Sequence, residues 1–332
     1  MGNYLSIKLR SDRFFHITRL SFSLVCLLLI SSCSTERETP LRIGTNVWPG
    51  YEPLYLARSL GYFDESSIHL VELASTSDVL HALRNGTLEG GALTMDEALS
   101  LLDSGIDMKV ILVMDLSEGG DVLLVKPEID ALDKLRGKKV AVEYSAVGAI
   151  LLDGALQRAG INTSDITIIA CPLNEHISCY QNYDAVVTFE PVRTKLLKQG
   201  ALQLFDSSMI RGRIVDVLAV NAELVKTHPY SLRKLLAGYF KARNYFAGNP
   251  EKAAQLMSVR MQLTPAEVLG SYDGLRLPDL EENRRLLGGQ PSPLQNTASE
   301  VSKFMLERKL LKHQISVESL IDDSFLPESR KK

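Results

Sequence analysis

The alternation of short apolar strands with helices constrains the fold of this chain most. From Leu41 onward, strand patterns and helix patterns follow one another, which is typical of α/β layers with largely parallel sheets. The first block is expected to contain strands at 42–47, 68–73, 90–94 and 109–115, and helices at 53–63, 77–86 and 96–105. Ser77 is the expected N-cap of the second of these helices.

A second alternating block follows a Gly-Gly break within residues 116–128. The break separates two apolar strands and is either a bulge in one edge strand or a crossing to another lobe. The expected strands are 139–144, 166–171, 184–189, 202–207 and 214–220, and the expected helices are 146–160, 191–200, 229–249, 250–261 and 296–312.

This layout predicts two α/β lobes with one lobe inserted into the other. We expect residues 41–117 and 212–332 to form the first lobe, with C-terminal helices, and residues 118–211 to form the second. With 332 residues, of which 45% are hydrophobic, the chain is long enough for two cores. Two lobes joined by two crossings form a hinged cleft, a common place for a small-molecule site.

The N-terminal segment is predicted to be a signal peptide. Basic residues precede the apolar run 20–30, which is about half the length needed to span a bilayer. The run ends in Ile-Ser-Ser-Cys at 30–33, which resembles the bacterial lipobox; the alternative is a simple secretory signal with a chance cysteine. We expect cleavage after residue 32, lipidation of Cys33 and a polar tether over 33–40.

Lipidation would hold the protein on the periplasmic side of a bacterial membrane through acyl chains. Ser34, in place of Asp, after the lipidated cysteine favours the outer membrane of a Gram-negative cell, with the inner membrane as the alternative. The formal charge of -3 gives no support to nucleic-acid binding.

The cysteines fit a compartment outside the reducing cytosol. Cys26 lies in the segment expected to be removed and Cys33 is expected to carry lipid, which leaves Cys171 and Cys179 as an even pair. They either form a disulfide or remain two separate buried thiols; the sequence leaves both open.

Motifs of common enzymes are absent from the sequence. The six histidines are scattered without metal-ligand spacing, and there is no nucleophile elbow, phosphate loop or dinucleotide-binding glycine motif. A site assembled from distant loops is still compatible with this absence. We expect no catalysis, no metal and no cofactor.

Polar and aromatic residues recur after successive strands, where open α/β sheets bind ligands. The candidate ligand-binding residues are Asn46, Trp48, Tyr51, Ser75, Thr76, Thr94, Asp96, Glu97, Tyr144, Ser145 and Glu190, together with Glu118, Asp121 and Asp216 at the crossings. Each also has a structural alternative, such as a helix cap, a helix-dipole charge or a turn residue. The recurrence favours a site.

Several segments resemble the periplasmic solute-binding proteins of ABC transporters in the nitrate, sulfonate, taurine and thiamine-pyrimidine group. The resemblance runs in order from Arg42 to Asn249 and is carried by "IGTNVWPGYEPLYLARSLGYF", "SEGGDVLLVKPE", "LRGKKVAVEY", "DAVVTFEPV", "LFDSS" and "IVDVLAV". It implies the type II periplasmic-binding-protein fold. It also implies a monomer that delivers one small ligand to a membrane permease driven by an ATPase.

The resemblance also implies roles for individual residues. Trp48, which on composition alone would be a core residue, lines the cleft; Ser145 offers its hydroxyl and a helix N-terminus to a polar ligand end. Glu190 accepts hydrogen bonds from an amine or amidine. The cysteine-rich motif of the fungal relatives that synthesise the thiamine pyrimidine is missing from this sequence.

The candidate residues favour a ligand with an amine or aminopyrimidine edge. Most charged candidates are acidic and none is a lysine or arginine, so a bare anion would be costly to bury. Taurine and sulfonates stay open, because helix N-termini alone can hold such groups. Two other functions also stay open: a sensory subunit with a membrane signalling partner, and an enzyme acting on a small aromatic metabolite.

Overall fold

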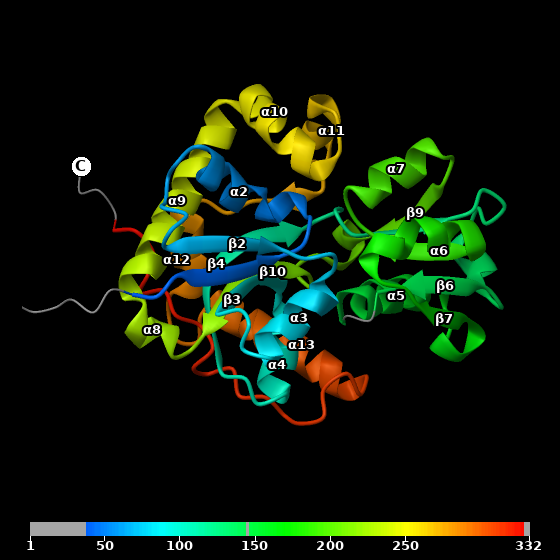
Figure 1. Ribbon diagram of the computed structural model, residues 1–332. Helices are drawn as coiled ribbons and strands as arrows, with labels where there is room; N and C mark the ends of the chain where they lie inside the picture. The colour runs from blue at the N-terminus through cyan, green and yellow to red at the C-terminus, as the bar shows by residue number, and fades with distance from the viewer. Residues whose placement is uncertain (1–37, 144–145, 329–332) are drawn as a thin grey trace, which may run out of the picture. The chain divides into compact units, whose positions relative to one another are not determined.

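The structure, a computed structural model, describes residues 38–143 and 146–328 (Figure 1). Its strands form two separate sheets, and the chain passes between them twice, once from β4 to β5 and once from β9 to β10. The predicted signal peptide, Cys33, Tyr144 and Ser145 lie outside the described residues. Among the described residues, no helix combines the length and the apolar character required to span a bilayer.

The first sheet has six strands in the order β11-β4-β10-β3-β1-β2. β1 is parallel to β2 and β3, and β10 is antiparallel to β3 and β4. The strands are β1 Leu41–Thr45, β2 Ile68–Glu72, β3 Gly90–Thr94, β4 Met108–Ser117, β10 Val215–Asn221 and β11 Leu275–Arg276. The residues that follow β1 and β3 therefore lie at the same sheet edge as the start of β10.

The second sheet has five strands in the order β7-β6-β8-β5-β9. β6 is parallel to β7 and β8, and β5 is antiparallel to β8 and β9. The strands are β5 Val122–Val125, β6 Lys139–Val142, β7 Thr167–Ala170, β8 Ala185–Thr188 and β9 Leu202–Asp206. The residues after β6 and β8 lie at the edge where β5 begins.

Helices cover both faces of the first sheet (Figure 1). One apolar cluster joins the sheet to α2, α9, α10 and α11, and another joins it to α3, α4, α12 and α13. The bounds are α2 Glu52–Ser59, α3 Thr76–Arg84, α4 Met95–Asp103, α8 Leu224–Thr227, α9 Pro229–Gly248, α10 Pro250–Met261, α11 Pro265–Gly270, α12 Leu280–Leu287 and α13 Pro293–Glu307. The 3₁₀ helix η1 Pro49–Tyr51 lies directly before α2.

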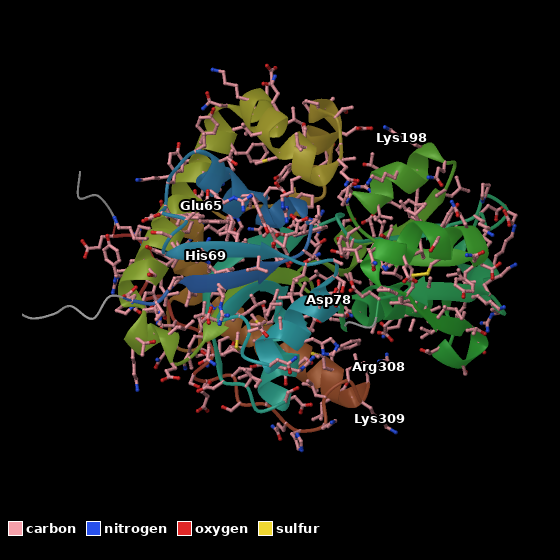
Figure 2. All side chains as sticks on the ribbon, viewed as in Figure 1. Glu65, His69, Asp78, Lys198, Arg308 and Lys309 are labelled. Carbon is pink, nitrogen blue, oxygen red and sulfur yellow. A yellow bond between two sulfur atoms is a disulfide. The ribbon has the colours of Figure 1, made fainter. Side chains whose placement is uncertain are left out.

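The second sheet is covered in the same way by α5 on one face and by α6 and α7 on the other. These helices are α5 Ala146–Ala159, α6 His176–Asn182 and α7 Val192–Lys198, and the 3₁₀ helices are η2 Leu132–Leu135, η3 Thr163–Asp165, η4 Leu173–Glu175 and η5 Ser207–Ile210. The structure joins Cys171 and Cys179 in a disulfide, seen as the yellow bond in Figure 2.

The alternating pattern therefore predicts the α/β layers correctly, and the Gly-Gly break at 119–120 proves to be a crossing between sheets. The strands of the first sheet fall within 41–117 and 212–332, and those of the second within 118–211. The exact lobe boundaries stay a prediction. The sequence patterns missed four short helices, α6, α8, α11 and α12, which are seven, four, six and eight residues long.

Local capping signals set where the helices begin. Ser75 caps α3 by accepting a hydrogen bond from the Asp78 N–H at 3.2 Å, so this helix starts earlier than the expected cap at Ser77. Ser292 caps α13 in the same way through the Gln295 N–H at 3.1 Å. The last helix consequently starts at Pro293 rather than at residue 296.

The side chain of Asn283 on α12 forms hydrogen bonds with backbone groups at the edge of β4. Its Oδ1 accepts a hydrogen bond from the Val113 N–H at 2.8 Å, and its Nδ2 donates to the Val113 carbonyl at 3.1 Å. The side chain is fully buried. It takes the place of a neighbouring strand, because β11 pairs only with Leu116 and Ser117 of β4.

Replacing Asn283 with alanine should destabilise the protein strongly. Two buried backbone groups of Val113 would lose their partners, which costs about 2 to 4 kcal/mol in the free energy of unfolding. Urea denaturation followed by circular dichroism measures the change. The matched control is Asn296→Ala, at an exposed position on α13, where we expect a change below about 0.5 kcal/mol. Equal effects of the two substitutions would contradict this role of Asn283.

Candidate functional site

A small cavity lies between the two sheets, with walls from both. Its volume is about 30 Å³, room for only about two water molecules. The lining residues are Asn46, Trp48, Tyr51, Thr94, Glu97, Asp121, Glu143, Val147, Gly148, His176, Val187, Phe189 and Asp216. Aromatic rings and carboxyl groups therefore make up much of the lining.

Trp48 and Tyr51 form the aromatic part of the first-sheet wall. The Trp48 indole Nε1 donates a hydrogen bond to Asp115 Oδ2 at 3.1 Å, and the Tyr51 hydroxyl donates to Asp216 Oδ1 at 2.6 Å. Both rings are buried, at 4% and 3% exposure. The intervening Gly50 permits this arrangement, because a Cβ there would lie 1.7 Å from Asp115 Oδ2.

Behind these rings, Asp115 on β4 and Asp216 on β10 are paired across antiparallel strands. Both side chains are buried. Burial raises the pKa of Asp115 to about 7, against the opposing effect of the Trp48 hydrogen bond. Burial and the neighbouring Asp115 raise the pKa of Asp216 well above its ordinary value. Two adjacent carboxyl groups of this kind hold a proton at neutral pH.

Further buried carboxyl groups extend this acidic cluster. Burial raises the pKa of Asp121, on the β4–β5 crossing, to about 6, and that of Glu143, after β6, to about 7. Glu97 on α4 is buried beside Asp96, and burial together with that charge raises its pKa well above the ordinary value. The Thr94 N–H donates to Glu97 Oε2 at 2.9 Å.

The second-sheet wall contributes Phe189 and His176. Phe189 packs edge to face on Trp48, with ring centroids 5.2 Å apart and an interplanar angle of 87°. Burial lowers the pKa of His176 to about 4, so the ring is neutral at pH 7. Its Nε2 lies 3.2 Å from the Cys171 carbonyl and its Nδ1 lies 2.9 Å from Thr188 Oγ1. A carbonyl can only accept, so Nε2 carries the proton and Nδ1 accepts from Thr188.

The described residues that line the cavity include no lysine or arginine. The nearby Arg260 is already paired with Glu52 and, at 2.6 Å, with Glu72. Its guanidinium also stacks on the Tyr55 ring, with Cζ 3.5 Å from the centroid. Among the described residues, the cavity wall is therefore acidic without a positively charged side chain, because His176 is neutral.

The structure brings six of the sequence-predicted residues together in the cavity lining: Asn46, Trp48, Tyr51, Thr94, Asp121 and Asp216. Glu97, an acid noted with them in the sequence, also lines it. Five others, Ser75, Thr76, Asp96, Glu118 and Glu190, are not among the lining residues. Tyr144 and Ser145 are not described.

Most of the residues outside the lining have other partners. Ser75 caps α3, Thr76 donates to Asn46 Oδ1 at 3.2 Å, and Glu118 forms an ion pair with Arg276 at 3.0 Å. Glu190 accepts hydrogen bonds from the Thr194 N–H at 3.1 Å and the Thr194 hydroxyl at 3.0 Å. The predicted hydrogen bond from a ligand amine to Glu190 stays a prediction.

The sequence reasoning missed four polar or aromatic residues of the site, Asp115, Glu143, His176 and Phe189, and the smaller lining residues Val147, Gly148 and Val187. Glu143 and Phe189 directly follow strands β6 and β8, so the strand-end rule applies to both. Asp115 is an acid inside an otherwise apolar strand, "KVILVMDLS", which is itself a signal for a functional role. Nothing in the sequence around His176 distinguishes it. Within the described residues, no group of three His, Cys, Asp or Glu side chains is arranged to hold a metal ion.

Two α/β lobes with a cavity between them are the fold of the periplasmic binding proteins, and the predicted type II fold is confirmed. The periplasmic aliphatic sulphonate binding protein SsuA from Escherichia coli superposes with a TM-score of 0.70 at 21% identity, over 89% of this chain and 95% of that chain. The periplasmic nitrate-binding protein NrtA from Synechocystis PCC 6803 gives 0.68 at 14% identity, over 87% of each chain. The desulfurization enzyme DSZB gives 0.62 at 14% identity, over 86% and 97%.

The chain belongs to the NMT1-like family, whose model matches residues 34–260. The 4-amino-5-hydroxymethyl-2-methylpyrimidine phosphate synthase THI11 from Saccharomyces cerevisiae is 27% identical over 245 residues, which are 66% of this chain and 70% of that protein. The taurine-binding periplasmic protein from Escherichia coli is 23% identical over 208 residues, 60% of this chain and 65% of that protein. The family resemblance inferred from the sequence is thus confirmed.

The acidic cluster should make the stability of the protein fall as pH rises from about 4 to 7. With pKa values raised in the folded state, the folded protein binds more protons than the unfolded chain over this range, so deprotonation costs stability. Asp121→Asn removes one such group. We expect the variant to gain about 2 kcal/mol relative to the wild type between pH 4.5 and 7.5.

Denaturant titrations at the two pH values measure this difference. Comparing each variant with the wild type cancels the opposite contribution of groups with lowered pKa values, such as Glu267. Asp133→Asn, at an exposed position, is the control and should show no pH-dependent difference. A relative loss of stability in Asp121→Asn at pH 7.5 would refute the assignment.

Proposed function

We propose that this protein is an extracytoplasmic solute-binding protein, anchored to a bacterial membrane through lipid on Cys33, that delivers a small polar organic ligand to an ABC permease and its ATPase. The observation that carries the proposal is the cavity of aromatic and polar side chains between the two sheets. A site shared between two hinged lobes suits reversible capture, because closure encloses the ligand.

Ligand binding requires the two lobes to separate, because a cavity of about 30 Å³ has no room for an organic molecule. Contacts at the rim of the cleft join the lobes. Lys198 on α7 pairs with Glu267 on α11, and Arg308, after α13, pairs with Asp153 on α5 at 2.5 Å. Figure 2 labels Lys198 and Arg308. The Trp48–Phe189 ring contact lies deeper. Opening breaks surface ion pairs that are each worth about 1 kcal/mol or less.

The crossings are suited to act as the hinge. Ser117 at the end of β4 and Ser207 after β9 share a hydrogen bond of 2.7 Å between their hydroxyl groups. The Gly119 N–H donates to the same Ser207 hydroxyl at 2.7 Å. These bonds tie the two crossings together where the lobes meet, while Gly119 and Gly120 leave the backbone free to rotate.

The wall chemistry supports a ligand with an amine edge, such as an aminopyrimidine or taurine. Asp121 and Asp216 offer acceptors for N–H groups, and Trp48 offers an aromatic surface. We propose Asp121 and Asp216 as the main acceptors, in preference to Glu190, whose carboxylate already accepts two hydrogen bonds from Thr194. Asn46, Tyr51 and Thr94 complete the proposed first-lobe contacts.

A second candidate function is an enzyme of small-molecule metabolism. It is favoured by the similarity to THI11, which is named as a synthase, and by the fold shared with the desulfurization enzyme DSZB. A sensory subunit that signals to a membrane partner when the lobes close is a further alternative. A gene for a permease and an ATPase beside this one would favour transport.

We expect the protein to bind its ligand without changing it chemically. Native mass spectrometry of the purified protein, followed by a thermal-shift screen of aminopyrimidines, taurine, alkanesulfonates and nitrate, should find a ligand that raises the melting temperature. The chain has one tryptophan, so fluorescence of Trp48 reports binding in the cavity directly. The ligand should be recovered unchanged in mass. Recovery of a product would establish the enzyme instead.

Lipid anchoring predicts that Cys33→Ala moves the protein from the membrane fraction to the soluble fraction. The substitution removes the thiol that would receive the acyl chains. Incorporation of labelled palmitate, measured alongside fractionation, should fall to background. The matched control is Cys26→Ala, within the signal segment, which should leave both measurements unchanged. Palmitate incorporation into Cys33→Ala at the wild-type level would rule out the lipid anchor on this residue.

A further inference from the structure

Four carboxyl groups line the cavity without a balancing cation. They belong to Glu97, Asp121, Glu143 and Asp216, and among the described lining residues there is no lysine or arginine. All four side chains are buried. Such a concentration of acids is costly unless protons or a positive ligand neutralise it.

One of these acidic side chains has a carboxylate oxygen without a hydrogen-bond partner among the described residues. Asp121 is 4% exposed, and its Oδ2 has no hydrogen-bond partner among the described residues. Asp115 Oδ1, one strand behind the cavity wall, is unpaired in the same way. Buried carboxylate oxygens nearly always have a partner, so an unpaired oxygen in a cavity wall calls for a donor from a ligand.

The Asp115–Asp216 pair is suited to hold a proton. The two carboxyl groups are buried on paired strand positions, and each negative charge disfavours ionisation of the other. The titratable and charged groups around the pair come from every neighbouring element: Tyr51 of η1, Asp96 and Glu97 of α4, Asp121 of the crossing, Tyr239 and Arg243 of α9, and Tyr272. Only Arg243 among these is positive, and it does not line the cavity.

The aromatic and aliphatic residues of the cavity lining favour a flat organic ligand. Trp48, Tyr51 and Phe189 supply aromatic surface, and Val147 and Val187 supply aliphatic surface. Aromatic faces attract cations as well as planar rings. A hydrated inorganic ion would leave this apolar part of the wall without a partner.

We propose that the cavity selects a flat organic cation whose amine or amidine N–H groups bind Asp121 and Asp216, and that its binding releases a proton from the Asp115–Asp216 pair to the solvent. The inference rests on the proposed binding function and specifies the charge of the ligand. Alkanesulfonates and nitrate, which carry no positive group, would face carboxylates of their own sign and are excluded from this site. Of the two ligands proposed above, this favours an aminopyrimidine over taurine, whose sulfonate would face the same carboxylates. The positive group replaces the proton as the neutralising charge, so the net charge of the closed site changes little.

Three molecules of nearly equal shape and different charge test the selectivity. Benzamidine is a cation, benzamide is neutral and benzoate is an anion. Titration of Trp48 fluorescence at pH 7.5 should give an affinity for benzamidine at least about 10-fold higher than for benzamide, because its hydrogen bonds are charge-assisted. Benzoate should produce no saturable change.

The outcomes separate the charge preference from the binding function. Equal or tighter binding of benzamide or benzoate would overturn the cation preference and leave solute binding intact. If neither these molecules nor any solute from the thermal-shift screen bound, both proposals would be contradicted.

Proton release is measured by calorimetry of benzamidine binding at pH 6.5 in two buffers of different ionisation enthalpy. The slope should show release of about 0.5 to 1 proton. Affinity should rise by up to about 10-fold from pH 5.5 to 7.5, because the bound cation favours the ionised carboxylates. No buffer dependence, or tighter binding at low pH, would refute the coupling.

Asp121→Asn and Asp216→Asn connect both effects to the named residues. Each should reduce benzamidine affinity about 10-fold or more while changing benzamide affinity little, since only the charge-assisted contact is lost. Asp216→Asn should also lower the buffer-dependent proton release well below that of the wild type. Asp133→Asn, an exposed carboxylate outside the cavity, should match the wild type in every measurement. Melting temperatures establish that each variant is folded, and an unchanged benzamidine preference in both cavity variants would overturn the proposal.

Discussion

The carboxyl groups of Asp115 and Asp216 are buried on paired positions of neighbouring strands. Burying two carboxyl groups side by side costs free energy, and hydrogen bonds from the surrounding residues offset part of this cost. Trp48 and Tyr51 each donate a hydrogen bond to one member of the pair. These rings reach the pair because Pro49 and Gly50 turn the chain into η1 and because Gly50 has no side chain to collide with Asp115. The acidic pair and the aromatic wall are therefore one structural unit.

The path of the chain brings the rest of the site to this unit. Parallel strands in each sheet place the residues after β1, β3, β6 and β8 at sheet edges, and the crossing that carries Asp121 joins those edges. The first sheet contributes most of the carboxyl groups, whereas the second contributes Glu143, Phe189 and the neutral His176. A ligand bound here would contact two bodies at once, so its binding energy would favour closure of the lobes.

Strand-end reasoning from the sequence located much of the site but not the direction of its side chains. Trp48, Tyr51 and Thr94 were found because side chains that follow parallel strands share an edge. Glu190 also follows a strand, yet it turns back to the free N–H and hydroxyl of Thr194 at the start of its own helix. Ser75 likewise caps α3. A polar residue at a strand end thus either caps the following helix or lines the cavity. The local sequence does not distinguish these two outcomes, because the same side-chain polar atoms can form the hydrogen bonds in either case.

By itself, the sequence determined the α/β class, the two blocks of alternating elements and the family, because these depend on hydrophobic period, turn residues and ordered motifs along the chain. Only the tertiary structure decided that the break at Gly119–Gly120 is a crossing and not a bulge. It also decided that Asp115 lies beside Asp216, that Cys171 is bonded to Cys179, and that Phe189 packs on Trp48. Such pairings depend on strand register and on how two sheets meet. They join residues up to 141 positions apart in the chain, as for Trp48 and Phe189, and local propensity carries no information over that distance.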